Sequence, residues 1–227
     1  IYQHDGKQYQ VEKLDFENHK AFVRAVEPDY YTDAMTYTKV TVMSRAQGST
    51  QPLVEMGAGE VSVVERVVGY KKIKFHTHEN VGYGDVRLPE MQMHTTAFLL
   101  TVPEDVLQRL ISEGAGTRPD LLDALGGLNA AMHTVGAVGL MIDPRDLGRC
   151  LGSRDGSGAR GEQLYEPTLF LYDQVPGGVG LSSRLFDERE TMLRGTRTLL
   201  EGCACEQGCP ACVGPGQVSP SPRGGEG

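Results

Sequence analysis

Four cysteines within ten positions near the end of the chain constrain its fold more than any other feature. They are Cys203, Cys205, Cys209 and Cys212. Gly208 and Pro210 lie between them and allow a short segment to turn sharply, so that four sulfurs can point inward. Four thiolates favour one zinc ion in a closed tetrahedral site, which stabilises structure and leaves no open position for a substrate.

Two other chemistries compete for these cysteines. An iron–sulfur cluster is the closer alternative, because a Cys-Pro pair and closely spaced cysteines also occur in cluster sites, although CxC is not their usual start. Disulfides come last, because a CxC bridge would be strained and we expect a reducing compartment. Cys150 has no neighbouring cysteine in the sequence, which is typical of a small buried residue.

The composition predicts a soluble, folded, cytoplasmic protein that does not enter a membrane. The chain has 227 residues, 39% of them hydrophobic, without an apolar run long enough to span a bilayer or a signal peptide at the start. Because residue 1 is isoleucine, we expect the chain to be cut from a longer polypeptide. The net charge of −8 argues against a surface that binds nucleic acid by bulk attraction, so any DNA contact has to be local.

Residues 1 to 102 are predicted to be β-rich, as a twisted antiparallel sheet or a small open barrel. Runs dense in Val, Tyr, Thr and Ile indicate the strands, and the glycine-containing segments 47–49 and 57–59 are predicted to be loops. Gly69, inside a long strand pattern, suggests a bend or bulge. The predicted strands are Lys7 to Leu14, Ala21 to Val26, Met35 to Met43 and Val61 to Phe75.

Residues 103 to 214 are predicted to be mostly helical, which makes the fold class α+β. A helix begins after Pro103, a buried helix covers about 120–142 and ends at Asp143-Pro144, and a further helix runs through 181–200. A short buried strand is expected at Thr168 to Tyr172, after a polar surface loop at 152–161. The tail, 215–227, is rich in proline, glycine and serine and is predicted to be flexible.

A glycine-rich loop and one histidine are further candidate site residues. Asp173 precedes a Pro-Gly-Gly-Val-Gly loop that contains Gly177 and Gly178, and a loop between a strand and a helix can cradle phosphate. No lysine or threonine follows as in a P-loop, so close backbone packing, with Asp173 capping the turn, is the preferred interpretation. His133 is interpreted as a hydrogen-bonded core histidine, with support of the cysteine site as the alternative.

A cluster of lysines and a set of histidines are the remaining candidate site residues. Lys71, Lys72 and Lys74 form the one basic cluster, which is a possible DNA contact or simply a solvated strand face. A third hypothesis is a metal hydrolase that uses His76, His78 and His94, with the first two on one face of a strand. No pair of acids or nucleophile arrangement supports that chemistry.

Several short motifs occur in a fixed order: Tyr9 to Asp15, Asp29 to Ala34, Ala131 to Thr134, Asp143 to Gly148, Leu169 to Asp173, Pro176 to Leu181, Cys203 to Cys205 and Gly208 to Cys212. Together they resemble the MrfA-type zinc-binding domain of superfamily 2 DNA repair helicases similar to mitomycin repair factor A. The most specific ones combine the aspartate–glycine loop with the cysteine quartet. The earlier part looks like the β-rich segment that precedes this domain.

The resemblance implies a non-motor C-terminal region of an ATP-dependent 3′–5′ DNA helicase in DNA repair, with the four cysteines as zinc ligands. Its implied partners are the helicase motor domains of the same polypeptide, with single-stranded DNA as a possible ligand. Neither a Walker A sequence nor a DExH box occurs in residues 1 to 227, so this chain alone is not expected to hydrolyse ATP. The alternative is a zinc-stabilised scaffold that docks another protein and does not contact nucleic acid.

Overall fold

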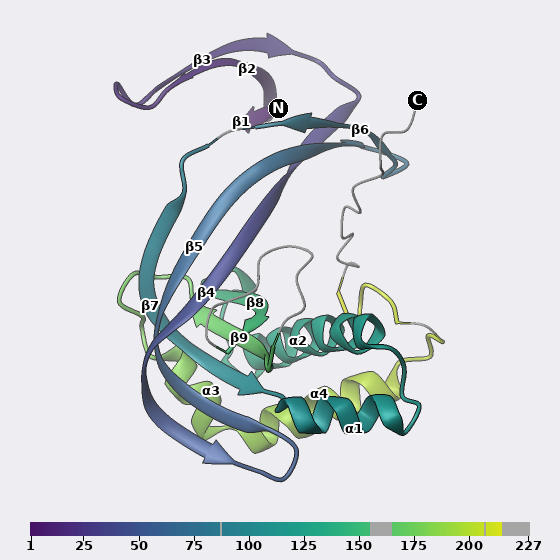
Figure 1. Cartoon of the computed structure of the whole chain (residues 1–227). Helices are drawn as coiled ribbons and strands as arrows, with labels where there is room; N and C mark the ends of the chain where they lie inside the picture. Colours follow the sequence, from purple (N-terminus) through teal and green to yellow (C-terminus); the bar gives the residue numbers. More distant parts are fainter. Residues whose placement is uncertain (87, 155–164, 207, 215–227) are drawn as a thin grey trace, which may run out of the picture. The chain divides into compact units, whose positions relative to one another are not determined.

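The computed structural model describes residues 1–86, 88–154, 165–206 and 208–214, and it confirms the predicted α+β class (Figure 1). Two compact units are present: Ile1–Tyr37 with Glu65–Met91, and Thr38–Val64 with the chain from Gln92 onward. The strands are β1 Tyr2–His4, β2 Lys7–Asp15, β3 Lys20–Val26, β4 Tyr30–Thr50, β5 Glu55–Lys74, β6 Asn80–Asp85, β7 Met91–Thr101, β8 Leu147–Ser153 and β9 Pro167–Asp173. The helices are α1 Glu104–Ser112, α2 Arg118–Leu140, the 3₁₀ turn Pro144–Asp146, α3 Leu181–Asp187 and α4 Arg189–Gly202.

The first unit contains a three-stranded antiparallel sheet in the order β1-β2-β3. Asp5 and Gly6 both have positive φ and form the tight turn between β1 and β2, as expected for an Asp-Gly pair. The register of β2 against β3 shifts by one residue between Val11 and Lys13, so Glu12 is the extra residue of a β-bulge. β6 pairs with the Gly69–Ile73 part of β5 in the same unit.

The larger sheet has the order β4-β5-β7-β9-β8, and its central strands are buried on both faces. Alternate residues of β7 and β9 belong to different apolar clusters: Phe98 and Leu171 point into one, Leu99 and Phe170 into the other. Because both faces are covered, these strands are continuous apolar runs and do not alternate with polar residues.

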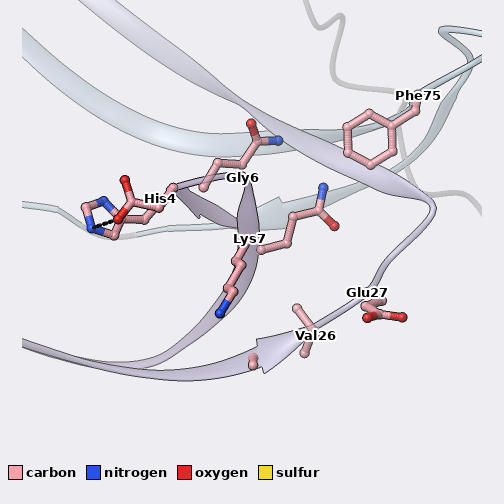
Figure 2. A pocket seen from close by; sticks show the side chains of 10 residues that line it. His4, Gly6, Lys7, Val26, Glu27 and Phe75 are labelled. Atoms are coloured by element: carbon pink, nitrogen blue, oxygen red, sulfur yellow. Dashed lines mark ion pairs between the residues drawn. The ribbon is translucent and has the colours of Figure 1, made fainter.

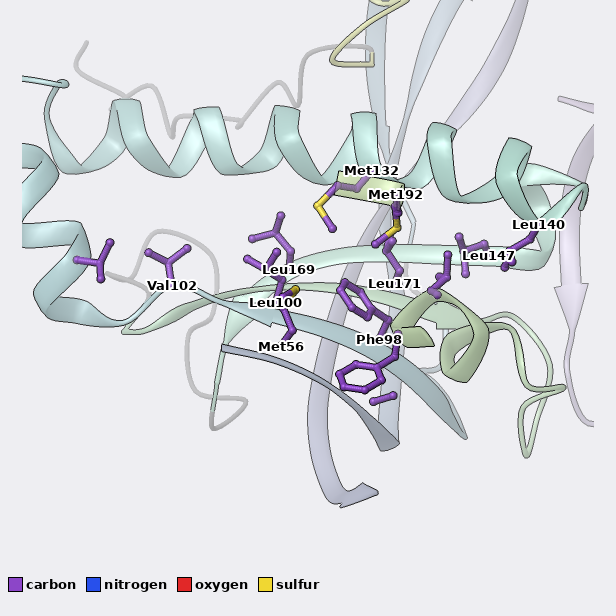
Figure 3. Close-up of a cluster of buried hydrophobic side chains, with 14 residues drawn as sticks. Met56, Phe98, Leu100, Val102, Met132, Leu140, Leu147, Leu169, Leu171 and Met192 are labelled. Carbon is purple, nitrogen blue, oxygen red and sulfur yellow. The ribbon is translucent and has the colours of Figure 1, made fainter. Parts of the chain in front are cut away.

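Helices α2, α3 and α4 cover one face of this sheet and form the main core (Figure 3). Met132 of α2 and Met192 of α4 are almost fully buried and point toward the strand side chains Leu169 and Leu171. α2 is apolar around much of its circumference, as a central helix should be, and a capping box at Thr117 and Asp120 fixes its start. It ends at Met141 in the left-handed conformation, just before Asp143-Pro144, as predicted.

Two predicted loops were wrong, and in one of them, 57–59, glycine allows the close approach of a neighbouring strand. Segment 47–49 lies within β4, and segment 57–59 lies within β5. A Cβ atom on Gly57 would lie 2.8 Å from the carbonyl oxygen of Gln47, so any side chain at this position would push the two strands apart. Sequence alone does not distinguish a glycine that turns the chain from a glycine that admits a neighbour.

Other local predictions also need correction. Gly69 pairs in regular register with Asp85, and the irregularity of β5 lies between Lys72 and Ile73. The helix predicted through 181–200 is two helices, which meet at Glu188. β8 was not predicted at all, because its sequence contains two glycines and one arginine; pairing with β9 stabilises it.

Other predictions extend beyond the described residues. The predicted loop 152–161 begins inside β8, and its residues from 155 onward lie outside the described residues, as does the tail 215–227. The division of the chain at residue 102 remains a prediction.

Candidate metal centre

The end of α4 delivers the first of the four cysteines. Cys203 is the C-terminal cap of that helix and already has extended dihedral angles, so the chain leaves the helix axis at this residue. Gly208 has φ of +82°, a conformation that glycine adopts without strain, and the chain turns back there. The N–H of Cys212 then donates to the carbonyl oxygen of Cys209, which closes a tight turn over the last two cysteines.

The four sulfur atoms converge on one point. The Sγ–Sγ distances are 3.6 Å between Cys203 and Cys209 and 3.5 Å between Cys205 and Cys212, and all four sulfurs lie within 4.8 Å of one another. A tetrahedron with zinc–sulfur bonds of about 2.3 Å has its corners about 3.8 Å apart. The donor set and its spacing therefore fit one zinc ion.

The same distances disfavour the two alternatives. A disulfide requires sulfurs about 2.05 Å apart, and each of these pairs is more than 1 Å wider. In an iron–sulfur cluster the four cysteines bind two or four different irons, so their sulfurs surround several atoms instead of one. Four sulfurs this close enclose room for a single ion.

The local environment shifts the pKa values of two of these thiols in opposite directions. Backbone N–H groups of Cys212 and Ala211 hydrogen-bond to the sulfur of Cys209 and lower its pKa to about 7. A hydrogen bond with Cys203, followed by one with Cys212, raises the pKa of Cys205 to about 12. Four thiolates side by side repel one another, and a divalent cation at their centre removes that penalty.

The cysteine segment is attached to α2 by the two residues that follow it. Val213 lies against the backbone of Gly127, where a Cβ atom would be 3.2 Å from the Cβ atom of Val213. Gly214 is similarly close to Ala130 one turn further along α2. Sequence reasoning missed this contact; the paired glycines at 126 and 127 in an otherwise apolar helix were the available signal.

Asp173 holds the glycine-rich loop together from inside the protein. Its carboxylate is completely buried and accepts hydrogen bonds from the N–H groups of Val179, Leu181 and Ser182 and from the Ser182 hydroxyl. These donors include the start of α3, so the carboxylate occupies the position that a bound phosphate would take.

The glycines of this loop are needed for its shape. Gly177 and Gly178 both have positive φ, at 81° and 73°. A side chain on Gly178 would collide with Thr96. The geometry agrees with a capped, closely packed turn.

His133 connects α2 to the segment that follows it. Its Nε2 atom is 3.0 Å from the carbonyl oxygen of Pro144 and 2.8 Å from that of Leu147. These are its hydrogen bonds within the described residues, and they brace the start of β8. Support of the cysteine site by His133 remains a prediction without a contact behind it.

The lysine cluster lies on β5 in the first unit, among aromatic rings. Lys72 Nζ is 5.5 Å from the centre of the Tyr30 ring, and Lys71 lies opposite Tyr83 on β6. Lys71, Lys72 and Lys74 are half-buried, and none of them forms an ion pair with a carboxylate of the described residues. Unpaired lysines beside aromatic rings suit a ligand with phosphates and bases.

The histidine hypothesis loses its geometric basis. β5 ends at Lys74, His76 lies in the turn after it, and His78 has a positive φ of 54°, so the two do not alternate along a strand. His94 lies on β7, in the other compact unit. Within the described residues, the four cysteines form the one cluster of metal-ligating side chains that was found.

A shallow hollow of about 940 Å³ occurs in the first unit, next to the β1–β2 turn (Figure 2). Lys7, Val26, Glu27 and Phe75 are among its lining residues, and His4 forms an ion pair with Asp5 at its rim. Its mixed charges and open shape do not indicate one ligand class. Across the part of the chain that the structure covers, no helix has the length and apolar character to cross a membrane.

Comparison with known proteins assigns the cysteine region. Residues 128–213, from α2 to the residue after Cys212, match the MrfA Zn-binding domain. The segment that contains the cysteines is therefore similar to this zinc-binding family. All four cysteines lie inside the matched range, so zinc is the metal that both the domain and the sulfur geometry favour.

Relatives resemble the chain well beyond this domain. It is 36% identical over 217 residues, 94% of its length, to the ATP-dependent helicase YprA of Bacillus subtilis strain 168. It is also similar to a crystal structure of the helicase MrfA bound to DNA, with 32% identity over 95% of the chain and a TM-score of 0.63. A crystal structure of MrfA alone matches with 28% identity over 94% of the chain and a TM-score of 0.55. The chain spans 27% of the length of each of these relatives.

Proposed function

We propose that this chain is the zinc-stabilised, non-motor region of an ATP-dependent 3′–5′ DNA helicase that acts in DNA repair in the cytoplasm. The observation that carries the proposal is the 36% identity to the helicase YprA along 94% of the chain, which includes the MrfA Zn-binding domain. The region braces the motor domains of the same polypeptide. It also offers a local surface for single-stranded DNA.

Zinc has a structural role in this proposal. Cys203, Cys205, Cys209 and Cys212 would hold the ion in a closed tetrahedral site, with all four positions taken by protein sulfur. Bound zinc would join the end of α4 to the segment that packs on α2 through Val213. A short segment with little core of its own is thereby fixed to the second unit.

The helicase assignment is tested on the full-length polypeptide that contains this chain. We expect ATP-dependent unwinding of a duplex with a 3′ single-stranded overhang, and none with a 5′ overhang. Metal analysis should give one zinc per chain, with no visible absorbance. Unwinding only from a 5′ overhang would contradict the direction, and a brown protein that contains iron would contradict the metal.

The DNA surface is proposed at the lysine cluster of β5. Lysines supply charge for phosphates, and Tyr30 and Tyr83 supply rings beside them, whereas the overall negative charge elsewhere would repel DNA. Binding should therefore be weak, local and sensitive to salt.

A Lys72→Ala variant tests that surface. It should weaken binding of a labelled single-stranded oligonucleotide and reduce the slope of log K against log salt by about 0.7 if one phosphate contact is lost. Lys20→Ala, on the exposed end of β3, is the matched control and should bind as the unmodified protein does. Equal effects of the two substitutions would argue for general attraction instead of a site.

The second candidate function is a zinc-stabilised scaffold that docks a protein and does not contact nucleic acid. The exposed apolar side chains of the β1–β3 sheet favour it. The two candidates differ in DNA binding at low salt: if the full-length protein and the isolated chain both fail to bind the oligonucleotide there, the scaffold function is preferred.

A further inference from the structure

The small sheet of the first unit is amphipathic. Partner residues of neighbouring strands lie on the same face of a sheet, so the register assigns each side chain to a face. On one face the sheet carries only apolar side chains between the Tyr2–Tyr9 pair and the far turn. They are Tyr2, Tyr9, Val11, Leu14, Ala21, Val23 and Ala25.

The β-bulge creates this apolar face. Val11 and Leu14 are three positions apart, and in a regular strand they would point to opposite sides. Because Glu12 is the extra residue, Val11 pairs with Val23 and Leu14 with Ala21, and both face the same way.

The other face is polar and carries the charges. Lys13, Asp15, Lys20 and Arg24 lie there with Phe22, and Arg24 bonds the carboxylate of Glu12 at 2.8 Å. Lys13 Nζ is 5.8 Å from the centre of the Phe22 ring. This face therefore has its own polar and aromatic partners.

The apolar face is exposed in this chain. The exposed fractions are 49% for Tyr2, 44% for both Val11 and Leu14, and 41% for Val23. Ala21 and Ala25, on the same face, are exposed as well. Together these side chains present on the order of 400 Å² of apolar surface, which is large for one face of a small sheet.

The chemistry of the face selects a protein ligand. The rings of Tyr2 and Tyr9 lie at one end of the face, and the rest of it is aliphatic. Val11, Leu14 and Val23 have no ring on which a base could stack and no charge for a phosphate. Lys7 and His4 stand only at its rim. An apolar protein surface loses little favourable hydration when it contacts this face, and the burial of apolar area on both sides is favourable.

The small area of this face favours a ligand on the same polypeptide over a separate protein. A stable complex between separate chains buries about 800 Å² on each partner, roughly twice what this face offers. A covalently connected partner has an effective concentration in the millimolar range, so a smaller contact suffices. The helicase relatives are about three and a half times as long as this chain, which covers 27% of them.

From these observations we infer that the apolar face of the β1–β3 sheet is where the motor part of the same polypeptide docks on this region. The inference rests on the proposed function for the presence of a motor. It adds the face, the residues and the apolar chemistry of the contact. The lysine surface of β5 is not used by it.

Hydroxyl-radical footprinting of the isolated 227-residue chain and of the full-length polypeptide tests the inference. Leu14 and Tyr2 should be oxidised severalfold more slowly in the full-length protein, while Phe22, on the opposite face of the same hairpin, should react equally in both. Equal rates for Leu14 and Tyr2 in the two proteins would overturn the inference. Equal protection of Phe22 would also overturn it, because the whole hairpin would then be buried without preference for a face.

Matched lysine substitutions and a concentration series complete the test. Val23→Lys in the full-length protein should remove the protection of Leu14, and Phe22→Lys should leave it in place; unchanged amide hydrogen exchange of β2 and β3 shows that the sheet of each variant is folded. Protection in the isolated chain that rises with its concentration would identify a second copy as the occupant and overturn the inference. Protection together with a lack of DNA-stimulated ATPase activity would instead contradict the helicase proposal alone.

Discussion

Strands β9 and β2 are both antiparallel, yet they depend on different interactions. Every residue of β9 is buried, between the helix-covered core and a second apolar cluster. No residue of β2 is fully buried, and pairing with β1 and β3 is its main stabilisation in this chain. The second unit thus contains its own core, whereas the small sheet of the first unit presents a face that needs a partner.

Loss of a cysteine ligand should have the largest effect, and it should be confined to the second unit. Cys209→Ser is expected to release the zinc and unfold the end of the chain after α4, because the apparent binding free energy of such sites reaches about 10 to 16 kcal/mol in small zinc peptides. Metal analysis and amide hydrogen exchange measure both effects. Ala211→Ser, at a non-ligand position of the same turn, should keep one zinc. If β2 lost protection as well, the two units would not be independent.

Truncation of one leucine in each region compares their cores directly. Leu171→Ala removes a fully buried side chain of β9 and should lower the free energy of unfolding by about 2 to 5 kcal/mol. Leu14→Ala in β2 should cost less than about 1 kcal/mol in this chain, since its side chain is 44% exposed. Urea denaturation measures both values. Similar costs would show that β2 is buried in solution.

Loss of the buried carboxylate of Asp173 should lower the free energy of unfolding by less than the largest loss expected for truncation of a core leucine. Asp173→Ala leaves the N–H groups of Val179, Leu181 and Ser182 without their acceptor and should cost about 2 to 3 kcal/mol. Asp187→Ala at the end of α3, an exposed position, is the control. If Asp173→Ala unfolds at the same urea concentration as the unmodified chain, the loop is not held by this carboxylate.

The ion pair at the start of the helical segment should have a smaller effect than Asp173 and a distinct pH dependence. The Arg118 guanidinium donates to Glu104 at 2.6 Å and lowers the pKa of that carboxyl below its usual value. The folded state therefore binds fewer protons than the unfolded state, so this stability is complete above the ordinary glutamate pKa and is lost as the pH falls through the folded value.

Glu104→Gln should accordingly cost about 1 to 2 kcal/mol at neutral pH, with the difference from the unmodified chain shrinking on acidification. Urea unfolding over a pH series measures it, with Glu113→Gln as the exposed control. A difference that grows toward acid pH would contradict the assigned direction of the shift.

Much of the fold was predictable where burial and periodicity agree. The start of α1, the central helix α2 with its end before Asp143-Pro144, and strand β9 were all predicted within a few residues. Predictions failed where glycine had two possible roles, as at Gly57, and where pairing with a neighbour overrides local sequence, as in β8. The break between α3 and α4 at Glu188 gave no signal, since the apolar spacing continues through it.

The sequence by itself determined the cysteine quartet and its relation to the zinc-binding family, because ligand type and spacing are properties of a few consecutive residues. Only the tertiary structure decided where those residues act. It brought four sulfurs to within 4.8 Å of one another, placed a carboxylate where a phosphate could have been, and used the bulge at Glu12 to turn Val11 and Leu14 to one face. These outcomes depend on contacts between distant segments, and the residues that make them have no local signature.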